Sequence, residues 1–286
     1  MSWTLAITGK GGTGKTTFAA LATRWLGENG LGPVLAVDAD PNACLDAALG
    51  VEVAATVGGV REEARQLAQE LSGAGAGLGG GLPRAAQPVA AGAQRRVSEG
   101  GMGKAELLDL KIQQALVEAD SFDLIAMGRP EGPGCYCYAN SVLRGVIERL
   151  GRGYRSMVID NEAGLENLSR RLVSRPAVLL FVSPPTPVGL RTARRLFDLA
   201  QEMGIEAGAT FVVVNRALDP ERARGLCSEQ FGGTSVELLG ILGHDHDLAA
   251  LDARGASLLG LPADAPIYRE VSAIMSRIVN HGAANT

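Results

Sequence analysis

Several features that mark particular protein classes are scarce in this chain of 286 residues. It has four cysteines, too few for a fold held together by disulfides. No apolar run approaches the roughly 18 residues of a membrane-spanning helix. The N-terminus lacks the basic and then apolar segments of a secretion signal. From these absences we expect a cytoplasmic protein, without a membrane partner, whose thiols stay free or bind metal.

Positive charge is also in short supply. Lys and Arg total 27 against 31 Asp and Glu, a formal net charge of −4. Because nonspecific binding to nucleic acid needs clustered cations facing phosphates, this balance argues against a nucleic-acid partner. The best local cluster is Arg191, Arg194 and Arg195, which we interpret as a solvated helix face. An apolar fraction of 46% with 20% charged residues is typical of an ordinary globular protein.

What the chain does have is a regular alternation of short apolar runs and helix-length segments. Strands that are almost entirely apolar and are separated by helices indicate a parallel sheet covered on both faces. We therefore predict an α/β fold with a doubly wound, mostly parallel sheet of seven or eight strands and helices on both faces. The expected strands span 3–8, 33–37, 122–127, 156–159, 177–182, 210–214 and 236–242, and the expected helices include 15–28, 57–71, 104–118, 141–150 and 267–279.

One region breaks this rhythm. Residues 73–103 hold ten of the 38 glycines and few large apolar side chains, so they are not expected to pack a core. The apolar run at 122–127 continues the strand pattern after them. We therefore expect a single domain over 1–286, with a mobile Gly/Ala-rich insertion at 73–103.

Residues 9–17 fit the phosphate-binding pattern G-x-x-x-x-G-K-[ST]. They lie between an expected strand and an expected helix, where glycines can turn N–H groups toward phosphates and the helix N-terminus adds positive charge. We expect Lys15 to reach the β- and γ-phosphates of ATP and the Thr16 hydroxyl to bind Mg²⁺. The other nucleotide-binding residues predicted here are Gly11, Gly12, Thr13, Gly14 and Thr17.

The additional lysine at position 10 turns this pattern into Lys-Gly-Gly-x-Gly-Lys-Thr. Because of this pattern, the chain resembles the deviant Walker A ATPases of the MinD, ParA and nitrogenase-iron-protein group. The resemblance implies a homodimer bridged by nucleotide, in which Lys10 reaches the phosphates held by the other subunit. There it would act in trans as a catalytic cation, as an arginine finger does. The alternative is a plain solvated lysine.

Three carboxylates follow expected strands, at the edge where parallel sheets bind ligands. They are Asp38, Asp40 and Asp160. The resemblance implies that Asp40 positions the attacking water, Asp38 supports the metal side, and Asp160 holds Mg²⁺ through water. A helix cap or turn residue remains the alternative for any one of them.

Three further residues gain a role from the same resemblance. Gly164, which closes the run Asp-Asn-Glu-Ala-Gly, corresponds to the switch II hinge near the γ-phosphate. Asn215 and Arg216 follow the strand expected at 210–214 and match the pair that reads adenine in relatives.

A pair of thiols forms a second candidate site. Cys135 and Cys137 follow the expected strand 122–127, at the same edge as the nucleotide. A disulfide between them would close a small, strained ring, whereas two thiolates suit Zn²⁺, Ni²⁺, Cu⁺ or an iron–sulfur cluster. A twofold dimer would supply four sulfurs. Two free cysteines beside a tight turn are the alternative. We interpret Cys44 and Cys227 as buried small apolar residues.

The residues around these thiols, 128–138 together with 160–171, resemble the CooC family of nickel-insertion ATPases. The resemblance spans the chain apart from the Gly/Ala-rich insertion. It implies a metallochaperone that binds nickel at Cys135 and Cys137, with Zn²⁺ possible at the same site, and passes it to apo carbon monoxide dehydrogenase or a related nickel enzyme. The chain departs from the family at Asn167 and around His244, and we interpret His244 and His246 as a polar loop.

Two other functions are compatible with the same fold. One is a MinD- or ParA-like positioning or partition ATPase. A MinD-like membrane tail would need a basic amphipathic C-terminal helix, whereas 267–279 contains only Arg269 and Arg277 as cations and is predicted to pack on the core. The other is an ATP-dependent electron donor like the nitrogenase iron protein, which would carry an iron–sulfur cluster.

Overall fold

The computed structural model describes residues 2–42, 44–60, 112–129, 136–163 and 172–283. The Gly/Ala-rich segment 73–103, most of the helices expected at 57–71 and 104–118, and the candidate residues Cys135 and Gly164 lie outside these ranges.

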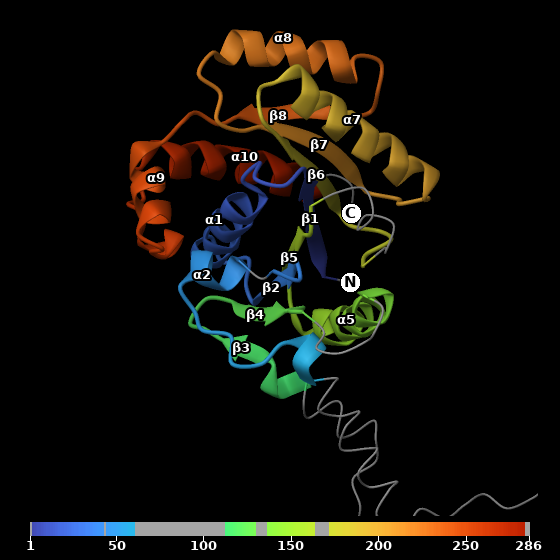
Figure 1. Cartoon of the computed structure of the whole chain (residues 1–286), viewed down its shortest axis with the longest axis vertical. Coiled ribbons are helices and arrows are strands. Elements are labelled where there is room, and N and C mark those ends of the chain that lie inside the picture. The colour runs from blue at the N-terminus through green and yellow to red at the C-terminus, as the bar shows by residue number, and fades with distance from the viewer. Residues whose placement is uncertain (1, 43, 61–111, 130–135, 164–171, 284–286) are drawn as a thin grey trace, which may run out of the picture.

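An eight-stranded sheet forms the centre of the molecule, in the order β3-β4-β2-β5-β1-β6-β7-β8 (Figure 1). All neighbouring pairs are parallel except β3 with β4. The doubly wound, mostly parallel sheet expected from the sequence is therefore confirmed. The strands are β1 (Trp3–Gly9), β2 (Val34–Ala39), β3 (Leu116–Glu118), β4 (Asp123–Ala126), β5 (Ser156–Asn161), β6 (Val178–Ser183), β7 (Ala209–Val214) and β8 (Glu237–Ile241).

Strand β3 corrects one expectation. The helix expected at 104–118 does not extend over residues 116–118, which form an antiparallel edge strand against β4. The run Leu-Val-Glu has no turn signal before it, and pairing with a neighbouring strand overrides its weak helical spacing.

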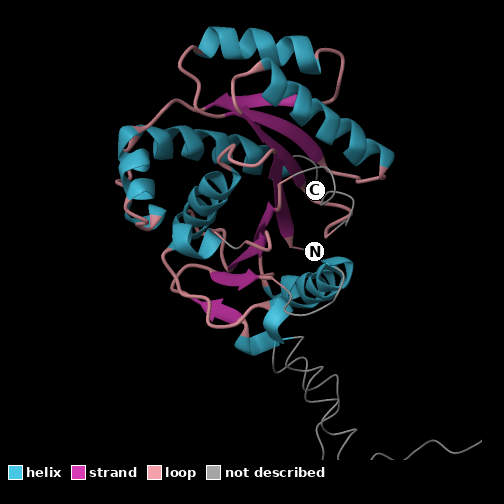
Figure 2. Cartoon of the chain, in the orientation of Figure 1, coloured by secondary structure: helices cyan, strands magenta, loops and turns pink. Residues whose placement is uncertain are grey.

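Helices lie on both sides of the sheet (Figure 2). One face packs against α1 (Lys15–Glu28), α2 (Leu45–Leu49) and α10 (Pro266–Ala283). The other face packs against α5 (Tyr136–Leu150), α7 (Pro187–Glu202) and α8 (Pro220–Phe231). The short helix α9 (His246–Ala253) precedes α10. Successive residues of a strand point to opposite faces, so Leu5 and Ile7 belong to the first core while Ala6 belongs to the second.

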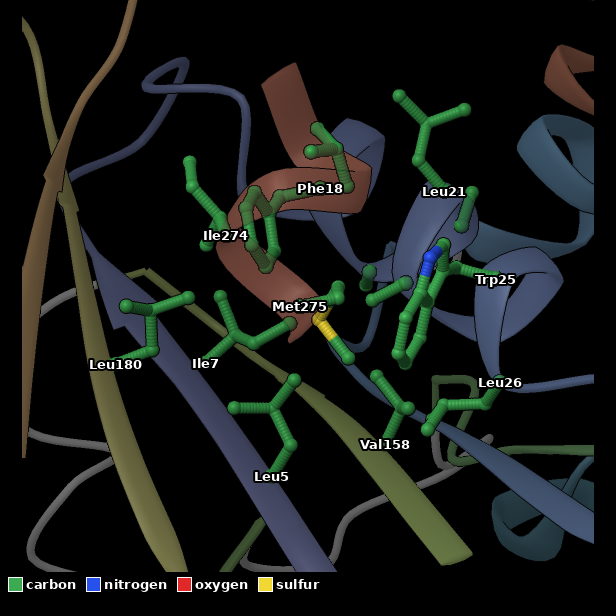
Figure 3. Close-up of a cluster of buried hydrophobic side chains, with 14 of the residues drawn as sticks. Leu5, Ile7, Phe18, Leu21, Trp25, Leu26, Val158, Leu180, Ile274 and Met275 are labelled. Atoms are coloured by element: carbon green, nitrogen blue, oxygen red, sulfur yellow. The ribbon is translucent and has the colours of Figure 1, made fainter. Parts of the chain in front are cut away.

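The first core is the larger, and Figure 3 shows its centre, where Phe18, Leu21 and Trp25 of α1 meet the sheet and α10. Helix α10 contributes a stripe of buried side chains at helical spacing: Ile267, Val271, Ile274, Met275 and Ile278. This confirms that the C-terminal helical segment packs on the core. Within the described ranges, no helix is both long and apolar enough to cross a membrane.

Candidate nucleotide site and its neighbours

The phosphate-binding loop runs from the end of β1 to Lys15, the first residue of α1. The loop closes on the carbonyl oxygen of Lys10, which accepts hydrogen bonds from Thr13 Oγ1 at 2.9 Å and from Lys15 Nζ at 3.5 Å. The Lys15 side chain is buried, whereas Lys10 is exposed. Lys15 therefore lies along the loop, whereas Lys10 is exposed to solvent in the single chain.

Gly14 is a position where only glycine fits. Its φ of 92° is unfavourable for residues with a side chain. A Cβ atom there would lie 2.2 Å from Asn215 Nδ2. That nitrogen donates a hydrogen bond of 2.8 Å to the carbonyl of Thr13, so it cannot retreat without losing the bond.

Asn215 and Arg216, which directly follow β7, both donate hydrogen bonds to the phosphate-binding loop. Besides the Asn215 bond, the Arg216 guanidinium donates to the carbonyl of Gly12 at 3.2 Å. The backbone N–H of Arg216 donates to Asn215 Oδ1, and Arg216 adopts a φ of 62°. This contact could not be predicted from the sequence, because the partners are 202 and 204 residues apart. Reading of adenine by this pair stays a prediction.

Thr16 and Asp160 meet at the centre of the site. The Thr16 hydroxyl donates to Asp160 Oδ2 at 2.6 Å. Asp160 is buried, and its Oδ1 atom has no hydrogen-bond partner among the described residues. Burial raises the pKa of Asp160 to about 7, with a further rise from Asp38, against the lowering effects of the Thr16 bond and Lys15.

This arrangement fits a magnesium ion. Mg²⁺ prefers hard oxygen ligands, and here a hydroxyl and a carboxylate oxygen lie side by side with a second carboxylate oxygen unsatisfied. A buried carboxylate without a partner is costly unless a cation or a proton balances it. The chemistry of the donor set therefore matches the expected roles of Thr16 and Asp160.

Asp38 is fully buried beside Asp160 and organises the loop after β2. Its carboxylate accepts hydrogen bonds from the backbone N–H groups of Asp40, Cys44 and Leu45 at 2.9–3.0 Å. Burial raises its pKa, and these bonds oppose the rise. The geometry accounts for Asp38 as the anchor of this loop and of the start of α2, whereas support of the metal stays a prediction.

Asp40 lies on the same loop and is less buried. Its Oδ1 atom accepts hydrogen bonds from both the backbone N–H of Asn42, at 2.8 Å, and the Asn42 side-chain amide, at 3.1 Å. The amide oxygen of Asn42 in turn accepts a hydrogen bond from the Arg129 guanidinium. Sequence reasoning missed this contact. Arg129 lies in the run 128–138 that carries the resemblance to CooC, but nothing in the sequence paired it with Asn42, which is 87 residues away.

The thiol pair is described only in part. Cys137 is the second residue of α5 and Cys135 lies outside the described residues, as does Gly164. Over the portion of the chain that the structure describes, no group of three or more His, Cys, Asp or Glu residues is arranged to hold a metal ion. His244 and His246 stack edge to face with ring centroids 5.2 Å apart.

One expectation about the other cysteines is wrong. Cys227 is buried as expected, but Cys44 is exposed. The reason is local, because Cys44 is the N-cap of α2 and its backbone N–H, not its side chain, points to Asp38. Partial desolvation of the sulfur and the nearby Asp38 and Asp40 carboxylates raise the pKa of the Cys44 thiol.

The order of the strands, the loop after β1 and the carboxylates after β2 and β5 together describe a nucleotide-binding α/β fold. The model of the CobQ/CobB/MinD/ParA nucleotide binding domain matches residues 4–258. The chain belongs to this family.

Members of the family at several distances resemble the chain. The uncharacterized ATP-binding protein MJ0685 of Methanocaldococcus jannaschii is 36% identical over 276 residues, which cover 96% of this chain and 98% of that protein. The carbon monoxide dehydrogenase accessory protein CooC of Rhodospirillum rubrum is 28% identical over 266 residues, covering 90% and 89%. The septum site-determining protein MinD of Pyrococcus horikoshii, solved with Mg-ADP, superimposes with a TM-score of 0.63 at 19% identity, covering 100% and 99%.

Proposed function

We propose that this member of the CobQ/CobB/MinD/ParA family hydrolyses ATP and carries a metal ion on Cys135 and Cys137, with nickel as the cargo and apo carbon monoxide dehydrogenase or a related nickel enzyme as the recipient. The observation that carries the proposal is the Cys-x-Cys pair itself, whose second cysteine, Cys137, lies in the first turn of α5. Arg129 donates a hydrogen bond to Asn42 on the loop of Asp40, and Cys135 follows Arg129 by six residues in the sequence. The 28% identity to the carbon monoxide dehydrogenase accessory protein CooC supports the proposed recipient.

In this proposal the phosphate-binding loop cradles ATP, and Lys15 turns from the Lys10 carbonyl to the phosphates. Bound Mg²⁺ would neutralise phosphate charge, and Thr16 and Asp160 are the residues that would hold it. The Asp40 carboxylate orients a water molecule in line with the γ-phosphate. Lys10, exposed in the single chain, reaches the phosphates of a second subunit and places a positive charge where the transition state develops negative charge.

The homodimer also completes the metal site. One chain offers two thiolates. Structural Zn²⁺ sites are almost always four-coordinate and are often built from cysteine sulfurs, and thiolates also bind other soft metal ions. Two copies related by a twofold axis offer two Cys135 and two Cys137. Hydrolysis, sensed by the loop of Asp40 and by the segment after Asp160, loosens the dimer and releases the ion.

Anaerobic titration tests this proposal. NiCl₂ and ZnCl₂ are added separately to wild type and to Cys135→Ser/Cys137→Ser in the presence of a nonhydrolysable ATP analogue, and native mass is recorded at each step. We expect one ion per two chains, lost in the double variant and retained in Cys44→Ser, the matched control at an exposed cysteine. Binding of one ion per chain, or binding that survives the double substitution, contradicts the proposal.

The fold likeness to MinD keeps a second function in view, a positioning or partition ATPase. A partition ATPase that binds DNA would need clustered cations that face phosphates. In the cluster of Arg191, Arg194 and Arg195, the Arg194 guanidinium instead donates hydrogen bonds to Asp198 at 2.9 Å and to the carbonyl of Gln230 at 2.8 Å. Binding of DNA or lipid vesicles by metal-free, ATP-bound protein would favour this second function. An iron–sulfur absorption spectrum after anaerobic purification would instead favour an electron donor.

A further inference from the structure

Asn42 connects a carboxylate of the nucleotide site to Arg129, an arginine in the loop that follows β4, the strand paired with β2. Its amide nitrogen donates to Asp40 Oδ1, and its amide oxygen accepts from the Arg129 guanidinium. The reverse orientation of the amide would set N–H groups against the guanidinium and an oxygen against the carboxylate. The charges on both sides therefore fix the amide in one orientation, and a hydrogen bond at either end strengthens the other.

The backbone that leads to Arg129 is held firmly. Met127 N–H donates to the carbonyl of Asp38 at 2.8 Å, and the Met127 carbonyl accepts from Gly58 N–H at 2.9 Å. Gly128 has a φ of 63°, and a Cβ atom there would lie 2.3–2.5 Å from the side chain of Thr56. The chain is thus fixed up to Gly128, and Arg129 is the first residue whose side chain reaches across to the Asp40 loop.

We propose that Arg129 is a positioning residue for ATP hydrolysis, which acts through Asn42 to hold the Asp40 carboxylate in the orientation that turnover needs. Asp40 receives two hydrogen bonds from Asn42 on one oxygen. This leaves the other oxygen available for water. When Arg129 withdraws, the Asn42 amide loses the charge that orients it, and the carboxylate is held by the backbone N–H alone.

Steady-state ATP hydrolysis tests the positioning role in the full-length, metal-free protein. We expect Arg129→Ala and Asn42→Ala each to lower kcat about 5- to 10-fold while KM for ATP stays within about twofold, because the lost contacts act on turnover rather than on binding. The double variant should lose no more than Asn42→Ala alone, since Arg129 acts through Asn42. Arg129→Lys, which keeps a cationic donor, should recover most of the rate.

Arg175→Ala is the matched control. Arg175 is also an exposed arginine in a side-chain contact, an ion pair with Glu206 at 2.8 Å, but it precedes β6 at the opposite edge of the sheet. Its substitution should leave kcat unchanged. If Arg129→Ala keeps the wild-type kcat, or if its loss adds to that of Asn42→Ala, the positioning role is contradicted. A parallel rise in KM would point to a purely structural effect and would also contradict it.

This inference rests on the proposed hydrolysis of ATP with Asp40 as the group that orients water, and not on the metal cargo. The kcat values are therefore measured on metal-free protein, beside the nickel titration of wild type. If wild type hydrolyses ATP but binds no nickel, carriage of metal fails, and the kcat values above still decide the positioning role. If wild type binds nickel at one ion per two chains but Arg129→Ala keeps the wild-type kcat, the positioning role is wrong while carriage of metal stands.

Discussion

The carboxyl edge of the sheet has two halves that are built in different ways. Around the phosphate-binding loop, after β1, β5 and β7, most contacts are buried or partly buried and most reach backbone atoms, as in the Asn215 bond to Thr13. The Arg216 bond to Gly12 is the exposed one among those described. After β2 and β4, the outer contacts join exposed side chains, as between Arg129 and Asn42. One buried group, Asp38, anchors this second half.

The difference assigns different tasks to the two halves. Buried bonds to backbone carbonyls hold one geometry, because breaking them leaves unpaired polar groups away from water. Exposed bonds between side chains are worth little to stability, since water replaces them at small cost. The first half therefore provides a preformed phosphate site, and the second half can change its arrangement during the reaction cycle.

The strongest test of the preformed half is a pair of glycine substitutions. Gly12 and Gly14 both have positive φ, of 74° and 92°, but an added Cβ meets nothing within 4 Å at Gly12 and Asn215 at 2.2 Å at Gly14. We expect Gly14→Ala to lower the free energy of unfolding by about 3 kcal/mol and to abolish ATP binding, against about 1 kcal/mol for Gly12→Ala. Urea denaturation and nucleotide titration check this, and equal losses would contradict it.

Asn215→Ala should have the next largest effect. It removes the donor to the buried carbonyl of Thr13 and the acceptor for the Arg216 N–H, at a cost of about 2 kcal/mol. In the Gly14→Ala background it should cost less, because it also removes the clash. A double-mutant cycle measured by urea denaturation gives the coupling directly. Strict additivity would show that the two residues do not contact each other as described.

Asp160→Asn should stabilise the metal-free protein. Burial raises the pKa of Asp160 to about 7 from 3.8, so between these values the folded state binds the extra proton and the free energy of unfolding falls as pH rises. Asn at position 160 does not ionise, so the free energy of unfolding of the variant does not fall in this way. We expect a gain of about 2 kcal/mol at pH 8 that disappears near pH 4, measured by urea denaturation at both pH values.

The same variant should lose the stabilisation that Mg²⁺ with ATP gives wild type, because Asp160 is the proposed magnesium ligand. A gain in stability that is the same at pH 4 and pH 8 would show that relief of the buried charge is not its cause.

The smallest effect on stability is expected in the exposed half. Asn42→Ala removes side-chain bonds to Asp40 and Arg129 that water can replace, so the free energy of unfolding should change by less than about 0.5 kcal/mol. The loss in kcat expected above should nevertheless remain. Thermal denaturation measures the change in stability, and steady-state kinetics measures the loss in kcat. A large loss of stability would erase the distinction between the two halves.

Much of the architecture could be predicted from the sequence. The sequence predicts seven of the eight strands to within about two residues, because parallel strands covered on both faces appear as continuous apolar runs. The helix after the phosphate-binding motif was placed at 15–28, as observed. Strand β3 was missed because three residues at an edge carry too little pattern to oppose a helical assignment.

Most of the site was predictable from the phosphate-binding motif and from carboxylates that follow strands, whereas contacts between distant polar side chains outside these patterns were missed. The glycines and Lys15 lie within nine residues of one another. Asn42 and Arg129 are 87 residues apart and meet only because β2 and β4 are neighbours in the sheet. Cys44 was assigned to the interior from its residue type alone, and its position at a helix start left it exposed.

The central claim is that the nucleotide and the metal influence each other across this edge. The affinity for nickel is measured by anaerobic titration of the same full-length protein, once with ADP and Mg²⁺ and once with a nonhydrolysable ATP analogue and Mg²⁺. The account predicts that the analogue tightens nickel binding by at least about tenfold, with one ion per two chains. Equal affinity in the two nucleotide states would contradict it.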